Sequence, residues 1–317
     1  MIGLLPAGIL LSLLLSSNST CGGVQVSGMQ KEDVAADTIT TFVLPSIPTM
    51  LNTPELRADY LARHYWENVN FADTNYVHHP EVTEQAWVNF IDVLRLVSAQ
   101  TGDAALRTLF EHAAREKKCY LYFTSLADKY LYDPNSPMRN EELYISVLDA
   151  ILEASVMDDT EKVRPQARRK LAQKNRMGTK ALDFTYTLAN GRQGSLHSIK
   201  ADYTLLFINN PGCHACGEMI KALKRSPSIC RAIAQKRMKL LSIYPDMDLV
   251  EWRRHLTDFP TEWINGYDKG QTIEQKNLYD LKAIPTLYLL DREKVVLLKD
   301  ATAEAVEEYL EKIYTTL

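Results

Sequence analysis

One stretch, residues 203–221, constrains the fold of this chain more than any other. An apolar run at 205–208 predicts a buried parallel strand, and the Asn-Asn-Pro-Gly sequence at 209–212 predicts a turn directly after it. The motif Cys-His-Ala-Cys at 213–216 follows, and an amphipathic helical pattern begins at once. The sequence therefore places a Cys-x-x-Cys motif where a strand passes into a helix.

This position gives the two thiols different chemistry. A thiol at a helix N-terminus meets unpaired N–H groups and the positive end of the helix dipole, so the thiolate of Cys213 is favoured. Cys216 lies one turn further on, within reach to close a disulfide. We therefore predict a two-electron redox centre. His214 between the thiols could favour the thiolate when protonated, or could be an exposed spacer.

Length and charge limit the classes of protein to consider. The 317 residues are enough for two ordinary domains, and 46% of them are hydrophobic, which is enough to build packed cores. The formal net charge is −4, and no basic run with interleaved aromatic residues is present. We therefore expect no nucleic-acid partner.

The first 21 residues have the pattern of a secretory signal. Their apolar run is short for a membrane span, and small polar residues and Cys21 follow it. Cys21 lies where a bacterial lipoprotein signal would place its acylated cysteine; the alternative is a cleaved signal with an incidental cysteine. Either reading predicts a periplasmic or cell-envelope protein, anchored to a membrane if Cys21 is lipidated. Residues 22–41 are small and polar and predict a linker.

Two cysteines remain after these assignments, Cys119 and Cys230. We expect both to be buried free thiols, because cysteine packs as a small hydrophobic residue. The sequence leaves a bridge between them open.

Residues 42–172 predict an all-helical domain. Apolar residues recur there at three- and four-residue spacing, and no strand pattern interrupts them. His78 and His79 could ligate a metal, but solvated loop histidines are the simpler interpretation. The aromatic residues of this half could form its core or a groove for a peptide. The expected helices begin at Thr53 and then cover residues 81–99, 103–131, 140–155 and 164–173.

Residues 174–317 change to alternating strands and helices, which predicts an α/β sandwich around a mixed sheet. The chain as a whole is therefore expected to be a two-domain α+β protein. After the strand and helix of the Cys-x-x-Cys motif, we expect strands at 239–244, 284–290 and 294–298. A hairpin is expected at 183–197, and helices at 248–256, 274–281 and 303–314.

The second half resembles the thioredoxin superfamily, and within it the TlpA/ResA-like extracytoplasmic branch. Four features carry the resemblance: the hairpin at 183–197, the Cys-x-x-Cys motif, an additional strand and helix at 239–256, and residues 279–286, which look like the cis-proline loop. The first half is similar to the uncharacterised helical domain that often precedes such folds in Gram-negative bacterial lipoproteins.

The resemblance implies a cis bond between Ile284 and Pro285, which proline makes possible at low cost. The backbone of Ile284 would then face the disulfide and could pair with an extended substrate peptide. The alternative is a trans proline at the start of a strand.

The sequence also departs from the family pattern. Phe207 lies where many thioredoxins carry a buried acid, and Gly212 replaces the aromatic residue before the first cysteine. Glu218 is a carboxylate near the thiol pair that could tune it, or a solvated residue complementing the helix dipole.

The resemblance predicts a thiol–disulfide oxidoreductase whose redox group is the Cys213–Cys216 disulfide, with no other cofactor. Cys213 would attack a substrate disulfide, Cys216 would resolve the mixed disulfide, and another protein would re-reduce the pair. The partners are then protein thiols and disulfides. Two alternatives stay open: a copper or zinc binding or delivery module, and a non-catalytic interaction lipoprotein.

Overall fold

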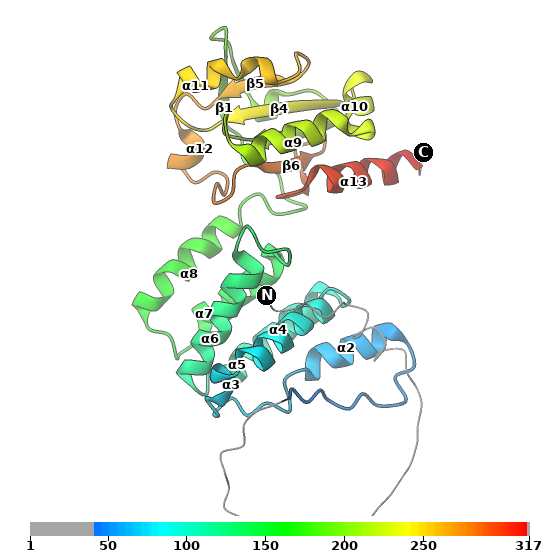
Figure 1. The fold of residues 1–317 in the computed structure, drawn as a ribbon, viewed down its shortest axis with the longest axis vertical. Helices are drawn as coiled ribbons and strands as arrows, with labels where there is room; N and C mark the ends of the chain where they lie inside the picture. Colours follow the sequence, from blue (N-terminus) through cyan, green and yellow to red (C-terminus); the bar gives the residue numbers. More distant parts are fainter. Residues whose placement is uncertain (1–40, 316–317) are drawn as a thin grey trace, which may run out of the picture. The chain divides into compact units, whose positions relative to one another are not determined.

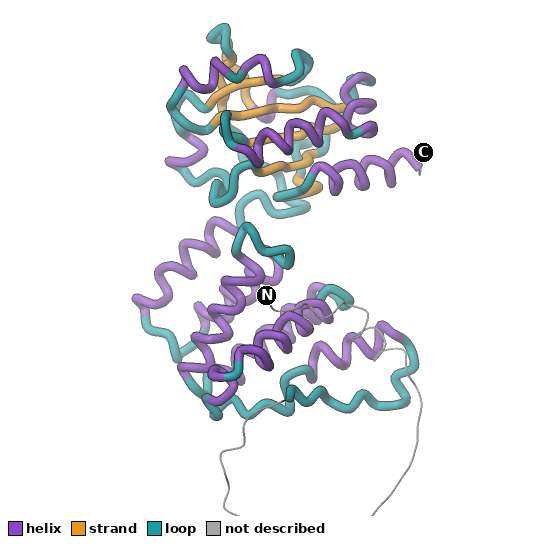
Figure 2. Tube along the Cα trace, viewed as in Figure 1, coloured by secondary structure: helices purple, strands orange, loops and turns teal. Residues whose placement is uncertain are grey.

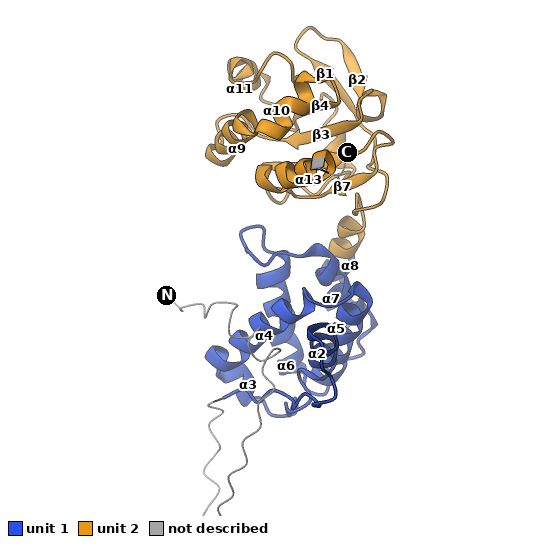
Figure 3. Cartoon of the chain, turned by 90° about the vertical axis from the view of Figure 1, so that its right-hand side faces the viewer, with its two compact units in different colours: residues 1–166 blue, residues 167–317 orange. Residues whose placement is uncertain are grey.

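The computed structural model describes residues 41–315, so the expected signal, Cys21 and nearly all of the linker lie outside the described residues. No helix among the described residues is long and apolar enough to cross a membrane. The chain divides into two compact units, residues up to 166 and residues from 167 onward (Figure 3). The division falls within a helix, α8 (Asp159–Ala172).

The first unit is helical, and several of its helices begin at capping residues that the sequence provides. The side chains of Thr53, Ser98 and Asn140 accept hydrogen bonds from N–H groups of the first turns of α2, α5 and α7. The elements (Figure 1) are α2 (Pro54–His64), α3 (Asn75–His78), α4 (Pro80–Leu94), α5 (Ala99–Ala113), α6 (Lys117–Ala127), the π-helical turn Asp128–Tyr132, α7 (Glu141–Glu153) and α8.

The aromatic residues of this unit form its core. Trp87 and Phe90 are fully buried, and Trp66 packs edge-on against Phe90 and Phe123. These rings, together with Tyr65 and Phe71, belong to one apolar cluster. Of the two interpretations of the aromatic pattern, the structure therefore favours the core.

Two helix predictions in this unit were wrong at their boundaries. The helix expected over 103–131 is broken at residues 114–116, where Glu116 adopts an extended backbone and caps α6. The helix expected to reach residue 99 ends at Leu94, because Ser98 begins the next helix. A helical period continues across such breaks, so periodicity alone does not locate them.

The histidine pair and Cys119 also have defined surroundings. His78 lies 2.8 Å from the Lys118 amine through Nε2, and His79 lies 3.1 Å from Glu81 through Nδ1, so both rings have protein partners. Cys119 is a buried free thiol, as predicted.

The second unit contains a mixed sheet, whose strands are orange in Figure 2. Its seven strands have the order β2-β1-β5-β4-β3-β6-β7. Strands β3, β4 and β5 are parallel, and the outer pairings are antiparallel. The strands are β1 (Thr185–Leu188), β2 (Gln193–Ser195), β3 (Tyr203–Ile208), β4 (Met238–Tyr244), β5 (Ile264–Tyr267), β6 (Thr286–Leu290) and β7 (Val296–Leu298).

Both faces of the sheet are buried, as the continuous apolar run in β3 predicts. Leu205 and Phe207 belong to the cluster on one face, and Leu206 and Ile208 to the cluster on the other. The first face is covered by α9 (His214–Arg225), α10 (Pro227–Ala234) and α13 (Ala303–Thr315), which appear in Figure 1. Residues 181–184 and 196–199, which flank the β1–β2 hairpin, and α12 (Thr272–Gln275) pack on the second face.

Three sequence predictions for this unit were wrong or incomplete. Strand β5 was not predicted, because its Asn265 and Gly266 weaken the strand pattern and pairing with β4 and β1 decides its conformation. The helix expected at 274–281 is the short α12, which ends before the left-handed residue Asn277. Cys230 is a free thiol but an exposed one.

Candidate redox site

The sheet brings three separate segments to one edge. In the ladder, Ile208 at the end of β3 pairs with Ile243 of β4 and with Thr286 at the start of β6. The turn that carries the Cys-x-x-Cys motif, the loop after β4 and the Ile284–Pro285 peptide therefore meet at this edge. The Ile284–Pro285 bond is cis, as the family resemblance implies.

The two thiols differ in exposure. Cys213 is the N-cap residue of α9 and is half-buried, whereas Cys216 is only 2% exposed. Hydrogen bonds lower the pKa of the Cys213 thiol, and burial opposes this effect. The hydrogen bond from the backbone N–H of Cys216 has the largest influence on this pKa. Burial raises the pKa of the Cys216 thiol to about 12. At neutral pH the accessible sulfur is thus the more acidic one.

The turn before the helix holds the buried sulfur in place. The backbone N–H of Asn210 donates to Cys216 Sγ at 3.4 Å. The neighbouring side chain of Asn209 is buried and donates to Ser242 Oγ at 2.8 Å and to the Phe207 carbonyl at 3.2 Å. The asparagines that the sequence identifies as turn residues therefore fix the turn to strand β4 and to the second cysteine.

A hollow of about 210 Å³ opens beside the thiols. It is lined by residues 209–213, Cys216, Gly217 and Ile220, and also by His255, Asp258 and Phe259. The last three come from the segment that begins with α11 (Leu249–Arg254) and lies some forty residues after the motif. Sequence reasoning found nothing that would bring His255 near the cysteines; the parallel pairing of β3 and β4 does so.

The His255 ring is held by two carboxylates. Nδ1 lies 2.7 Å from Asp258 Oδ2, and Nε2 lies 2.9 Å from Glu251 Oε1. These contacts, the one with Asp258 first, raise the pKa of His255. The i, i+3 and i, i+4 spacing of these residues on a helical turn was the one signal in the sequence that could have identified the cluster.

The remaining predicted site residues lie outside this hollow. His214 is exposed at the first helical position of α9. Glu218 is exposed, and its bond to the Lys221 amine, 2.8 Å long, lowers the pKa of its carboxyl. No group of three or more His, Cys, Asp or Glu side chains among the described residues is arranged to hold a metal ion, so the geometry gives the metal-binding alternative no support.

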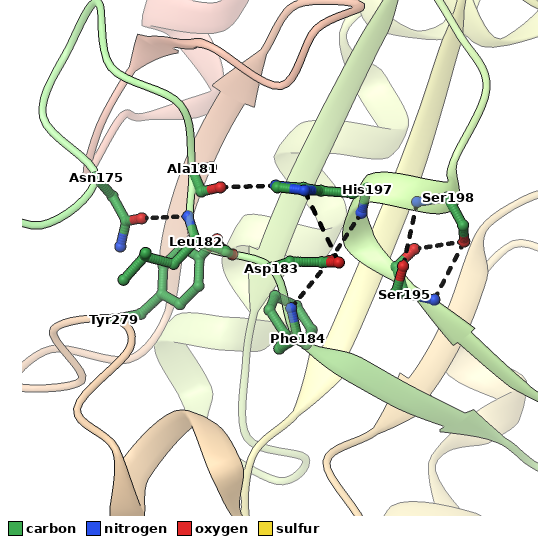
Figure 4. A network of polar contacts seen from close by, with 9 residues as sticks. All are labelled: Asn175, Ala181, Leu182, Asp183, Phe184, Ser195, His197, Ser198 and Tyr279. Carbon is green, nitrogen blue, oxygen red and sulfur yellow. Dashed lines mark hydrogen bonds and ion pairs between the residues drawn. The ribbon is translucent and has the colours of Figure 1, made fainter.

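The loop that leads to Pro285 is fastened by a buried polar network (Figure 4). The side chain of Asn175 accepts from the Leu182 N–H at 2.8 Å, as Figure 4 shows. It also donates to the Leu278 carbonyl at 2.8 Å. The Tyr279 hydroxyl donates to the Leu182 carbonyl at 2.7 Å. These bonds tie residues 278–279 to the segment that precedes β1.

Asp183 extends this network towards the hairpin. Its Oδ1 accepts from the N–H groups of Phe184 and His197 at 3.0 and 2.9 Å, and His197 Nε2 lies 2.7 Å from the Ala181 carbonyl (Figure 4). The hairpin expected at 183–197 is therefore a structural support for the site.

Comparisons with known proteins agree with this architecture. A crystal structure of a thioredoxin-like protein from Bacteroides caccae is 62% identical, with a TM-score of 0.85; the match covers 87% of this chain and 99% of that chain. The C-terminal domain of an uncharacterized protein from Bacteroides fragilis is 64% identical over 43% of this chain and 98% of that chain, with a TM-score of 0.43. A family model described as a domain of unknown function (DUF5106) matches residues 20–175. No curated protein matches.

The second unit thus has a thioredoxin-like fold with its Cys-x-x-Cys motif at the start of α9. The Bacteroides caccae thioredoxin-like protein is 62% identical, and the match covers 87% of this chain and 99% of that one, so the chain belongs to the thioredoxin superfamily. Its first half is the uncharacterised helical domain that the sequence comparison identifies.

Proposed function

We propose that this protein is an extracytoplasmic thiol–disulfide oxidoreductase that uses Cys213 and Cys216 through a mixed-disulfide intermediate. The observation that carries the proposal is the difference between the two sulfurs. An accessible thiol of lowered pKa begins the helix, and a buried thiol of raised pKa lies one turn behind it. The first can attack a disulfide from solvent, and the second is shielded until a mixed disulfide forms beside it.

The exchange proceeds in two substitutions at sulfur. The Cys213 thiolate attacks a substrate disulfide, so that a Cys213–substrate bond forms, the substrate S–S bond breaks and one substrate thiolate leaves. Cys216, after losing its proton, attacks Cys213 Sγ, closes the protein disulfide and releases the second substrate sulfur. Two electrons have then passed from the protein to the substrate, and a dithiol protein must return them.

Ile284 and Pro285 are proposed to hold the substrate backbone. They directly precede β6, whose first residue pairs with the end of β3, and both are partly exposed at the same edge as the thiols. An extended peptide laid along this edge would present its disulfide to Cys213. The substrates are therefore taken to be protein disulfides.

We place the protein in the periplasm or cell envelope because its first 21 residues have the pattern of a secretory signal. Cys21 is then the proposed lipid-attachment residue, and a membrane is the surface to which the chain would be tethered. Protein disulfides form and persist in the oxidising compartments outside the cytoplasm, where substrates for this exchange are found. His214 and Glu218 are proposed only as modifiers of the redox potential from the exposed side of α9.

Insulin reduction by the full-length protein tests the proposal. The wild type is expected to reduce insulin with dithiothreitol as the electron source, and Cys213→Ser is expected to lose this activity. Cys230→Ser, which removes an exposed thiol outside the motif, is the matched control and is expected to keep it. Equal activity of the wild type and Cys213→Ser would refute the proposal.

A further inference from the structure

The exchange leaves one proton without an assigned acceptor. Cys216 must lose its proton before it can attack, and burial disfavours that loss. Its close polar neighbour, the N–H of Asn210, donates to the sulfur and cannot accept a proton. The strand position where many thioredoxins carry a buried acid is occupied by Phe207, whose side chain is fully buried. The polar side chain two residues later, that of Asn209, is an amide.

The hollow that Cys213 and Cys216 line is also lined by a titratable ring. His255 is partly exposed into this space, and its two nitrogens are bonded to Glu251 and Asp258. A hollow of about 210 Å³ is large enough to hold water in the space that the ring and the sulfurs both line. Proton transfer through one or a few waters requires no direct contact between the ring and Cys216.

The charged groups around this ring favour the imidazolium, which is the form that can give a proton to the first substrate thiolate. Glu251 and Asp258 face it from its own segment, and the guanidinium of Arg254 pairs with Glu251. Besides His255 and Asp258, the titratable groups that line the hollow are Cys213 and Cys216. The carboxylates favour the imidazolium, and the raised pKa of His255 agrees with this.

We propose, on the basis of the exchange reaction proposed above, that His255 is the proton-transfer residue of this redox site. It takes the place of the strand carboxylate that this chain lacks, and Glu251 and Asp258 are its positioning residues.

The proton then follows a closed cycle. When Cys213 displaces the first substrate thiolate, the His255 imidazolium gives that thiolate its proton and becomes neutral. The neutral ring next takes the proton of the Cys216 thiol through water, and the Cys216 thiolate closes the disulfide. The imidazolium is restored, the proton of Cys216 has in effect reached the first substrate thiol, and the second sulfur leaves as a thiolate.

A stopped-flow experiment with 5,5′-dithiobis(2-nitrobenzoate) isolates the second half of this cycle. Full-length protein in which Cys21, Cys119 and Cys230 are serine is mixed, reduced, with this reagent between pH 5 and 9. The first equivalent of coloured thiolate reports attack by Cys213, and the second reports resolution by Cys216. The released aromatic thiolate needs no proton, so the rate of the second phase depends on deprotonation of Cys216.

We expect the wild-type second phase to accelerate as His255 loses its proton and then to level off. In His255→Gln this phase should be at least about tenfold slower at pH 7, and should keep rising with pH without a plateau. The first phase should change little. His64→Gln is the matched control, because its ring is also bonded to a carboxylate, Glu67 at 2.9 Å, but belongs to the helical unit.

An unchanged second phase in His255→Gln, in both rate and pH profile, would overturn the inference. Release of only one equivalent by the wild type would instead overturn the proposed function. Asp258→Asn provides a second test that keeps the ring: loss of one carboxylate partner should lower the pKa of His255 and move the midpoint of the second phase to lower pH. An unmoved midpoint also counts against the inference.

Discussion

Cys213 occupies a position where backbone geometry controls side-chain acidity. The N–H groups at the start of α9 hydrogen-bond its sulfur and lower its pKa. The Cys213 thiolate should therefore persist to lower pH than the thiolate of an ordinary cysteine, whose pKa is about 8.5. Alkylation of the native protein with iodoacetamide, followed by peptide mass spectrometry across pH 5–10, should therefore label Cys213 at lower pH than the exposed Cys230. Cys216 should react only after unfolding. Coinciding profiles for Cys213 and Cys230 would contradict this assignment.

Gly212 is a second position where the backbone decides which residue is tolerated. Its φ of +75° lies in the left-handed region, and a Cβ there would lie 3.5 Å from Glu251 Oε1. We expect Gly212→Ala to lower the free energy of unfolding by about 1–2 kcal/mol. Gly217, with no atom within 4 Å of its Cβ position, is the control. Gly217→Ala should raise stability by up to about 1 kcal/mol in calorimetry.

At the scale of elements, the loop before Pro285 depends on one asparagine. Asn175 is buried, has a φ of 51°, and bonds both Leu278 and Leu182. Asn175→Ala leaves two backbone groups without these partners, so we expect a loss of about 2–3 kcal/mol in urea unfolding. Asn277 shares the left-handed backbone but is exposed. If Asn277→Ala costs as much as Asn175→Ala, the backbone conformation and not the hydrogen bonds would explain the effect.

The elements that sequence reasoning located well are those whose signals are local. The helix start at Thr53 and the apolar run of β3 each depend on a few neighbouring residues, and the structure confirms them. Strand β5 and the end of α12 depend on distant pairing and on one left-handed residue, Asn277. A period in the sequence cannot report either of these, so both were missed.

At the scale of the whole molecule, each compact unit contains apolar clusters of its own. Trp87 is 0% exposed in the helical unit, so Trp87→Ala should destabilise that unit by about 3–5 kcal/mol. At temperatures below the lowered unfolding transition of Trp87→Ala, this variant should reduce insulin through Cys213 at the wild-type rate. Leu121→Ala, at a 41% exposed position of the same unit, should change neither property. Loss of reduction by folded Trp87→Ala would show that exchange depends on the helical unit.

The sequence by itself determined where the two thiols of the motif lie: Cys213 at the helix N-terminus and Cys216 one turn later. It also determined the buried central strand, because that strand is encoded in a short apolar run, whereas the cis bond before Pro285 was implied by the family resemblance. Only the tertiary structure decided what surrounds the sulfurs. His255 and Asp258 reach the hollow because β3 and β4 run parallel, so the segments that follow them emerge at the same edge of the sheet.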